Sequence, residues 1–371
     1  MKEALMPKKR RGLILSAYDA GSHRYWRKGI EARLNEFDWT VLTLPARYFN
    51  WRIRGNPISF IEQFSSELSR EYDFVIATSM VDLATLRGLV PSVANTPSLI
   101  YFHENQFEYP QSDKQNKSIE PQMVNLYSAL AADQLVFNSE FNRSSFFQGC
   151  DELMAKLPDY TFKDLSKRLY NKSSVIPVPI SDGLFSIPVH HPEKNSPIKL
   201  IWNHRWEYDK GPDRLWCFLK ELELRGTAFE ISIVGERFRT IPSEFERIKK
   251  YFTDKIKYFG YIENVDDYWQ LLSCSDVVLS TAIHEFQGVA VMEAVAAGCL
   301  PLVPNRLSYR ELIGEQYRYE SIVNSPEKEA VAAVDTLLKV IDKGNDKLRE
   351  QFEQYSWSSL TGLYQKVINQ L

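Results

Sequence analysis

The sequence STAIHEFQGVAVMEAV, residues 280–295, decides the fold expected for this chain. The apolar segment 276–280 before it has the length and composition of a buried strand, and the small and apolar residues at 288–297 predict a helix. The polar loop between them holds Glu285, and Glu293 lies within the first turns of the helix. A strand that leads through a loop into a helix is the building block of a parallel sheet.

The same alternation extends outward in both directions. We predict further strands at 12–17, 40–44, 73–78, 98–102, 134–138, 199–203, 230–234, 256–260 and 300–303, with helices between most of them, including 25–37 and 60–70. A stretch rich in Pro and polar residues at 186–197 interrupts the pattern and is typical of a linker. The expected fold class is therefore α/β, with two Rossmann-like, doubly wound parallel-sheet domains facing across a cleft.

Three ranges follow from this organisation. Residues 1–190 are expected to form the first domain and residues 191–352 the second. The end of the chain, 353–371, is predicted to be a helix that crosses back to the first domain.

Composition excludes several classes of protein. The chain has 371 residues, of which 44% are hydrophobic and 25% charged, as in ordinary globular proteins. No apolar run approaches the roughly 18 residues of a membrane span, so no membrane span is expected. A cytoplasmic location is expected instead. Four distant cysteines without a C-x-x-C pair predict buried thiols rather than disulfides. Six histidines without an H-E-x-x-H motif give no reason to expect a metal or another cofactor.

Charge is distributed unevenly along the chain. The net charge is −3, yet residues 1–60 carry 12 Lys and Arg against 5 Asp and Glu. This excess indicates an anionic partner, nucleic acid or an acidic membrane, or else a solvated surface with a charged tail.

The loop at 285–293 carries the strongest functional signal. The amides of Phe286, Gln287 and Gly288 are expected at a helix N-terminus, where they favour anions. Glu285 and Glu293 flank these amides and can accept hydrogen bonds from sugar hydroxyls. The spacing of the two acids alone is common, so the strand–loop–helix context carries the inference.

A second loop, RWEYDKG at 205–211, follows the predicted strand 199–203. Arg205 and Lys210 flank a turn and could both reach a pyrophosphate. The alternative is a surface ion pair of these cations with Glu207 or Asp209.

The first half has candidate residues at two strand ends. His103, Asn105 and Gln106 follow the strand 98–102, and the first loop contains Gly21, Ser22 and His23, with Arg24 next. Gly and Ser allow close approach of a ligand to the backbone, but the loop lacks the G-x-G-x-x-G of a dinucleotide site.

Aromatic and basic residues alternate at 47–54, where Arg47, Arg52 and Arg54 surround Trp51. Such a pattern suits nucleic acid, because cations contact phosphates while aromatic rings stack on bases. An ordinary loop whose aromatic residues cover the core is the alternative.

At these residues the chain resembles the retaining, GT-B-fold glycosyltransferases of family 4, and more narrowly the tRNA-queuosine α-mannosyltransferase group. The segments that carry the resemblance are AYDAGSH (17–23), LPARYFNWRIR (44–54), YFHENQFEYP (101–110), VFNSEFN (136–142), NHRWEYDKGPD (203–213) and STAIHEFQGVAVMEAV (280–295).

The resemblance implies a donor, GDP-mannose, and an acceptor, the cyclopentenediol of queuosine at the tRNA wobble position. It implies that the domain of residues 1–190 binds the acceptor and the domain of residues 191–352 the nucleotide sugar. The residues implied in catalysis are His103, Arg205, Lys210 and Glu285. The residues implied in donor binding are Gly21, Ser22, His103, Arg205, Lys210, Tyr261, Ile262, Glu285, Phe286, Gln287, Gly288, Val289 and Glu293. The residues expected at the acceptor are His23, Arg24, Arg47, Trp51, Arg52, Arg54, Asn105 and Gln106.

Two other functions remain open from the sequence. A family 4 glycosyltransferase could act on a lipid or envelope polysaccharide, with the basic residues of 1–60 facing a membrane. A non-catalytic nucleotide-sugar or RNA-binding protein is the other, and the presence of Glu285, Glu293, Arg205 and Lys210 together argues against it. The oligomeric state does not follow from the sequence.

Overall fold

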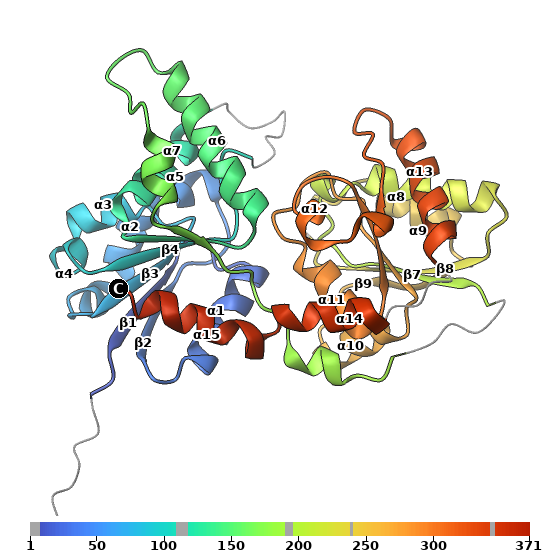
Figure 1. The fold of residues 1–371 in the computed structure, drawn as a ribbon, viewed down its shortest axis with the longest axis horizontal. Coiled ribbons are helices and arrows are strands. Elements are labelled where there is room, and N and C mark those ends of the chain that lie inside the picture. The colour runs from blue at the N-terminus through green and yellow to red at the C-terminus, as the bar shows by residue number, and fades with distance from the viewer. Residues whose placement is uncertain (1–7, 109–117, 190–195, 238–239, 342–345) are drawn as a thin grey trace, which may run out of the picture. The chain divides into compact units, whose positions relative to one another are not determined.

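The computed structural model describes residues 8–108, 118–189, 196–237, 240–341 and 346–371. The chain divides into two compact units (Figure 1): unit 1 is Met1–Val178 with Leu360–Leu371, and unit 2 is Pro179–Ser359. The boundary expected between residues 190 and 191 lies outside the described residues. Residues 179–189 belong to unit 2 because Ile180 forms a β-bridge with Ser356 there. The second change of unit follows Ser359, seven residues after the expected position at 352.

Unit 1 is built on a six-stranded parallel sheet in the order β2-β1-β3-β4-β5-β6. Its strands are β1 (Arg11–Ser16), β2 (Asp38–Thr43), β3 (Phe74–Thr78), β4 (Ser98–Phe102), β5 (Gln134–Phe137) and β6 (Ser173–Val175). Its helices are α1 (Gly21–Arg33), α2 (Phe49–Leu68), α3 (Leu83–Leu89), α4 (Pro91–Ala94), α5 (Glu120–Ala131), α6 (Glu140–Lys156), α7 (Leu165–Tyr170) and most of α15 (Trp357–Ile368).

The end of the chain packs into unit 1 through α15. The Tyr364 hydroxyl accepts a hydrogen bond from the Trp26 indole at 3.0 Å and donates to Tyr101 at 3.0 Å. Trp26 in turn stacks on the Tyr101 ring, with the two centroids 4.3 Å apart. All three side chains are buried, so this polar contact inside an apolar core fixes where the last helix lies.

Unit 2 has a second six-stranded parallel sheet, in the order β12-β11-β10-β7-β8-β9. Its strands are β7 (Ile198–Trp202), β8 (Phe229–Val234), β9 (Ile256–Gly260), β10 (Val277–Leu279), β11 (Leu300–Pro304) and β12 (Arg318–Tyr319). Its α-helices are α8 (Pro212–Leu224), α9 (Glu244–Tyr251), α10 (Val265–Ser273), α11 (Val289–Ala297), α12 (Tyr309–Leu312), α13 (Pro326–Val340) and α14 (Asp346–Phe352). Its short 3₁₀ helices are η1 (Asp182–Ser186), η2 (Tyr208–Lys210), η3 (Glu315–Tyr317) and η5 (Glu353–Tyr355).

The predicted fold class of two doubly wound, Rossmann-like α/β domains is confirmed by these sheets. Read from β9 to β12, unit 2 has the dinucleotide-binding order 3-2-1-4-5-6, and unit 1 has the flavodoxin-like order 2-1-3 at its start. The central strands β3 and β4 are buried at every residue, as parallel strands covered on both faces must be.

Two helices begin earlier than the sequence predicts. Helix α1 starts at Gly21 instead of residue 25, so the expected loop residues Gly21 to His23 form its first turn. Helix α2 starts at Phe49 instead of residue 60, although it contains Pro57. Proline lacks the N–H that would bond to the Ile53 carbonyl, and the Asn56 side-chain amide donates to that carbonyl at 3.1 Å instead. The aromatic and basic stretch at 47–54 is therefore mostly helical rather than a loop.

The four cysteines are free, but only Cys150 and Cys299 are buried. Cys217 is half-buried and Cys274 is exposed, which corrects the expectation that all four are core residues. Among the described residues, no group of His, Cys, Asp or Glu is arranged to hold a metal ion. No helix within the described ranges combines the length and the hydropathy needed to cross a membrane.

Candidate functional site

Both sheets bring candidate residues to the point where the strand order reverses. In unit 2 this point lies between β7 and β10, and in unit 1 between β1 and β3. Ligands of doubly wound sheets bind beyond the carboxyl ends of such strands. The loops there are 203–211 and 280–288 in unit 2, and 17–20 and 79–82 in unit 1. The residues after β4 adjoin the latter pair.

A buried lysine joins the two loops of unit 2. Lys210 is 7% exposed, and its ammonium donates to the His284 carbonyl at 2.8 Å and lies 3.2 Å from both Asp209 Oδ2 and Glu285 Oε2. The ion pair with Asp209 is one that the sequence offered as the alternative to a functional role. The Lys210–Asp209 pair is not a surface ion pair, because Lys210 is buried and also bonds Glu285 across the switch point.

These contacts set the charges in the cluster. Burial alone would raise the pKa of Glu285, but the Lys210 ammonium and nearby histidines lower it to about 2. Burial, together with the charge of Lys210, lowers the pKa of both His204 and His284 to about 4. At neutral pH the cluster therefore holds an ionised glutamate beside two neutral imidazoles.

Arg205 is the accessible cation of this site. Its side chain is 41% exposed and pairs with Glu207 Oε2 at 3.1 Å. Burial raises the pKa of Glu207, and Arg205 opposes that rise. The sequence brings Arg205 and Lys210 to one loop, where one cation faces solvent and the other is held by acids.

The amides between the two acids lie at the start of α11, as predicted. Gly288 has φ 84° and precedes Val289, the first helical residue, and a Cβ at Gly288 would lie 2.8 Å from the Tyr309 ring. Phe286 and Gln287 are buried, and the Gln287 amide points back to Met292 Sδ at 3.3 Å. The N-terminal amides of this loop are thus fixed by close packing and by a backbone conformation that favours glycine.

Glu293 lies on α11, near β7. Its carboxylate accepts a hydrogen bond from the Tyr268 hydroxyl at 3.2 Å, and burial raises its pKa to about 7. The Asn203 amide donates to the same Tyr268 oxygen at 3.0 Å and to the Ala290 carbonyl at 2.7 Å. Glu285 and Glu293 therefore differ in charge at neutral pH, a contrast that the sequence spacing did not reveal.

Tyr261 and Ile262 follow β9, two strands from the switch point. Tyr261 is 58% exposed, and its carbonyl accepts a hydrogen bond from the Tyr258 hydroxyl at 2.9 Å. Among the described residues, no hydrogen bond or ion pair joins either of them to the Lys210 cluster.

In unit 1, two buried histidines stack on each other. The rings of His23 and His103 are 4.1 Å apart and nearly parallel, and the edge of Trp26 contacts His103. Burial, and secondarily His23, lowers the pKa of His103 well below its ordinary value. The His103 ring is therefore neutral, and its position is set by aromatic packing.

Glu104 is a residue that the sequence motif contained but that was not assigned a role. Its Oε2 lies 3.0 Å from His23 Nε2, and its Oε1 accepts from the Ser79 hydroxyl at 2.9 Å. Glu104 thereby links the ends of β3 and β4 to α1. The signal that could have found it is the presence of polar residues within two positions of the ends of two neighbouring parallel strands.

Asn105 and Gln106 are committed to contacts within unit 1. The Asn105 amide donates to the Asn142 side chain at 2.9 Å and to Ser145 at 3.0 Å, and its oxygen accepts from two amides of its own loop. Gln106 is buried, with its amide near Met80 Sδ. Their geometry shapes the loop after β4.

The first turn of α1 holds the remaining candidates near this loop. Gly21 has open space where a Cβ would lie, and Ser22 is exposed. Arg24 is half-exposed and lies 3.4 Å from Asp19 Oδ2, while Arg27 binds the same carboxylate at 2.9 Å. Only His23 of this turn contacts the His103 cluster directly.

The basic and aromatic stretch has two kinds of arginine. Arg54 pairs with the buried carboxylate of Asp82, whereas the guanidinium of Arg52 forms no hydrogen bond or ion pair with a described residue, although Arg52 is only 6% exposed. Arg47 is exposed with its guanidinium over the Tyr48 ring, and Trp51 is 54% exposed. Burial and the nearby Arg47 lower the pKa of Arg52.

Within each unit the structure thus assembles one cluster from distant parts of the sequence. Unit 2 brings together Arg205, Lys210, Glu285 and the start of α11, with Glu293 on the same helix. Unit 1 brings together His23 and His103. The sequence did not assign a role to several residues that contact the candidates directly or through Tyr268: Ser79, Glu104, Asn203, Tyr268 and His284.

Both halves of the chain match known protein families. Residues 11–180 match the family model described as tRNA-queuosine alpha-mannosyltransferase N-terminal, and residues 186–357 match glycosyl transferases group 1. A tRNA-queuosine alpha-mannosyltransferase from Drosophila melanogaster is 32% identical over 368 residues, which cover 96% of each chain.

Solved structures show the same fold. HepE from Anabaena in a complex with UDP aligns with a TM-score of 0.68 at 13% identity, over 98% of this chain and all of that one. Sucrose-phosphate synthase from Thermosynechococcus elongatus aligns with a TM-score of 0.75 at 14% identity, over 98% and 99% of the two chains. The GT-B fold predicted from the sequence is confirmed, and the chain, a glycosyltransferase, belongs to the tRNA-queuosine alpha-mannosyltransferase family.

Proposed function

We propose that this protein transfers mannose from GDP-mannose to a hydroxyl of the queuosine cyclopentenediol in tRNA, with retention at the sugar carbon. Family membership supports the reaction and the tRNA acceptor. The observation that carries the proposal is the Lys210 cluster, where a buried cation links two loops at the switch point of a dinucleotide-type sheet. The proposed location is the cytoplasm, where tRNA is used.

The donor contacts follow from the charges of unit 2. The Arg205 guanidinium and the Lys210 ammonium would face the diphosphate, with the amides of 286–289 beside them. Glu285, ionised and held by Lys210, would accept hydrogen bonds from mannose hydroxyls. Glu293 would bind the ribose, and Tyr261 with Ile262 would contact the base. Gly21 and Ser22 of unit 1 would approach the donor phosphates.

The chemistry needs no protein nucleophile. The acceptor oxygen bonds to the sugar carbon on the face from which the diphosphate departs, and the acceptor proton passes to the departing phosphate oxygen. The products are GDP and mannosylated tRNA. Arg205, Lys210 and the helix amides would stabilise the negative charge that grows on the leaving group. These groups supply the positive charge within the chain, so we propose that the transfer proceeds without a metal.

Unit 1 would serve the acceptor and the sugar. His103, neutral and fixed by the stack with His23, would contact the mannose, while His23 would meet the acceptor. Arg24, Arg47, Trp51, Arg52 and Arg54 would contact tRNA, and Asn105 with Gln106 would shape the loop between them.

The test is incubation of the protein with queuosine-containing tRNA and a panel of nucleotide sugars, followed by mass analysis of the nucleosides. We expect a hexose on queuosine with GDP-mannose only, at the same rate with and without EDTA. A hexose added from another donor would refute the proposed donor, and no addition with any donor would refute the reaction.

A further inference from the structure

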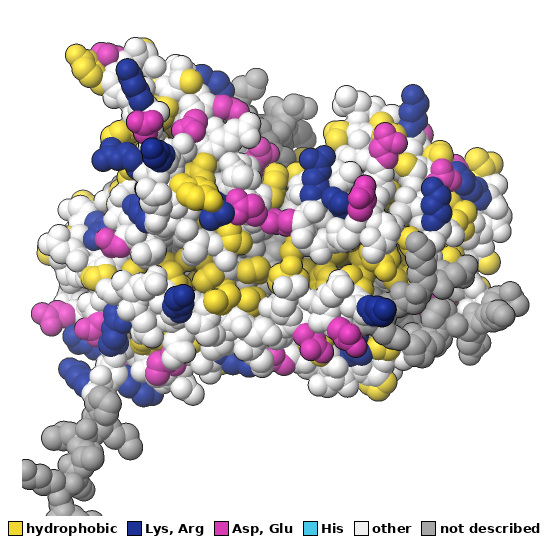
Figure 2. All heavy atoms as spheres, viewed as in Figure 1, with side chains coloured by type: hydrophobic (Ala, Val, Ile, Leu, Met, Phe, Trp, Pro, Cys, Tyr) yellow, Lys and Arg dark blue, Asp and Glu magenta, His cyan; other side chains and the backbone are white. Residues whose placement is uncertain are grey.

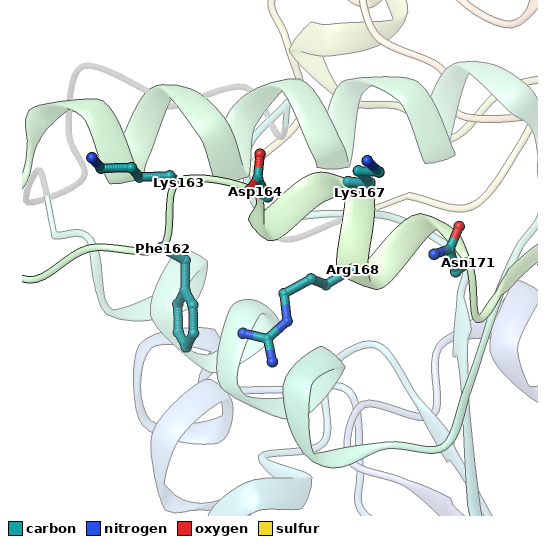
Figure 3. A pocket seen from close by; sticks show the side chains of 6 residues that line it. All are labelled: Phe162, Lys163, Asp164, Lys167, Arg168 and Asn171. Carbon is teal, nitrogen blue, oxygen red and sulfur yellow. The ribbon is translucent and has the colours of Figure 1, made fainter.

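The segment 157–171, between α6 and β6, is not used by either cluster. It connects the end of α6 to α7 and projects from unit 1 (Figure 1). Phe162, Lys163, Asp164, Lys167, Arg168 and Asn171 line an open hollow in it (Figure 3). The surface that carries α6 and α7 shows Lys and Arg side chains next to hydrophobic ones, with a few acids between them (Figure 2).

Three aromatic rings on this segment are exposed to solvent, although Tyr170 also contacts the Phe147 ring and lies under the Arg143 guanidinium. Tyr160 is 98% exposed and sits in a left-handed turn with φ 47°, and Phe162 and Tyr170 are each about half-exposed. Exposed aromatic side chains grouped on one element contribute little to the core and are typical of binding surfaces.

The cations beside these rings lack acidic partners. Within the described residues, Lys163, Lys167 and Arg168 form no ion pair, whereas Arg143 on the neighbouring helix is paired with Glu140. Arg168 instead places its guanidinium over the Phe162 ring, 5.2 Å from the centroid, and Figure 3 shows the two side chains on the same side of the segment. A helix C-terminus favours Lys167 and Arg168, but it accounts neither for Lys163 nor for the exposed rings.

We propose that this segment is an RNA-binding surface that contacts the backbone of the tRNA acceptor; the inference rests on the proposed function. Lys163, Lys167 and Arg168 bind phosphates, and the exposed aromatic rings stack on bases or pack against ribose. Helix α6 has 17 residues and spans about 25 Å from its start beside β5. The surface thus meets a part of the tRNA distant from the nucleotide held at the ends of the strands.

The test replaces the three cations together, Lys163→Gln, Lys167→Gln and Arg168→Gln. The matched control removes three exposed lysines of unit 2: Lys249→Gln, Lys250→Gln and Lys339→Gln. We expect the first variant to raise the KM for full-length queuosine tRNA about tenfold and to reduce the salt dependence of log K by about 2. The KM for GDP-mannose and transfer to a short anticodon-loop fragment stay at the wild-type values.

Filter binding of tRNA measures the salt dependence without any transfer, so it tests the surface even where the wild type moves no mannose. Unchanged tRNA affinity in the first variant refutes the surface while leaving the reaction intact. An equal loss in the control variant refutes its location. Loss of binding to anionic phospholipid vesicles with tRNA affinity unchanged assigns the surface to a membrane instead.

Discussion

The donor-site cations of unit 2 differ in their partners from two groups of cations in unit 1. In unit 2, the cations of the candidate donor site are already paired: Lys210 with Asp209 and Glu285, and Arg205 with Glu207. In unit 1, Arg52 is buried without an acidic partner, and the cations of the segment 157–171 have none among the described residues.

The difference follows from what each site has to do. Paired charges hold their positions at neutral pH, so a small ligand meets donors and acceptors that need little reorganisation. Unpaired cations on a surface repel one another, and their electrostatic free energy falls when a polyanion such as RNA binds to them. The paired charges of unit 2 therefore suit precise binding of a small ligand. The unpaired cations of unit 1 suit binding of a polyanion.

The largest expected effect comes from breaking the charge cluster of unit 2. Lys210→Ala leaves Glu285 and Asp209 as buried carboxylates without their cation and removes a positive charge from the diphosphate. We expect kcat to fall by at least about a hundredfold and the free energy of unfolding to fall by about 3 kcal/mol. Steady-state kinetics and denaturant unfolding measure the two effects.

Lys220→Ala on α8 is the matched control, because that lysine pairs with Glu223 on an exposed surface. This substitution should leave kcat unchanged and should change the free energy of unfolding very little. Wild-type turnover in a folded Lys210→Ala protein would remove Lys210 from the site, whatever its contribution to stability.

A smaller effect sharpens the contrast between the two glutamates of the α11 loop. The raised pKa of Glu293, about 7, means that this carboxyl gains its charge between pH 6 and 8, where Glu285 stays ionised. An ionised Glu293 accepts ribose hydrogen bonds more strongly. We therefore expect the KM for GDP-mannose to fall several-fold from pH 6 to pH 8 in the wild type, and to vary little in Glu293→Gln.

The stability of the fold is expected to fall with pH, whereas donor binding is expected to strengthen. The folded pKa lies above the ordinary value of 4.5, so the folded protein binds more protons between about pH 4.5 and 7 and loses stability as pH rises through that range. Glu293→Gln removes this loss, and its melting midpoint should exceed that of the wild type more at pH 8 than at pH 5. A pH-independent difference in melting, with a KM that still falls, would assign the titration to another group.

How far the sequence could reach depends on the kind of residue. Strand–loop–helix periodicity predicted the sheets. The polar residues that follow strands made Lys210, Glu285 and His103 candidate site residues, because parallel strands bring their carboxyl ends to one edge of a sheet. Tyr268 and Ser79 lie far from their partners Glu293 and Glu104 in sequence, and only packing brings them together. Periodicity also placed the start of α2 at residue 60 instead of Phe49. The helix continues through Pro57, where the Asn56 side-chain amide donates to the carbonyl that proline leaves free.

The smallest expected effect separates two arginines two residues apart on α2. Arg52→Gln removes a buried charge that no acid balances. The free energy of unfolding should therefore stay within about 0.5 kcal/mol of the wild-type value or rise slightly. Its contribution is to RNA: we expect the KM for queuosine tRNA to rise about fivefold, with the KM for GDP-mannose unchanged. Arg54→Gln instead removes the partner of the buried Asp82 carboxylate, so it should destabilise the fold as well.

The pair can be distinguished because the two readouts move differently. Asp82 keeps the Thr85 amide, at 3.0 Å, and the Thr85 hydroxyl, at 2.8 Å, as hydrogen-bond donors in Arg54→Gln, so the protein should remain folded with a lower melting midpoint. If Arg52→Gln destabilises the protein more than Arg54→Gln and leaves the tRNA KM unchanged, Arg52 is a structural residue. The contrast with the donor site of unit 2 would then depend on the segment 157–171 and no longer on Arg52.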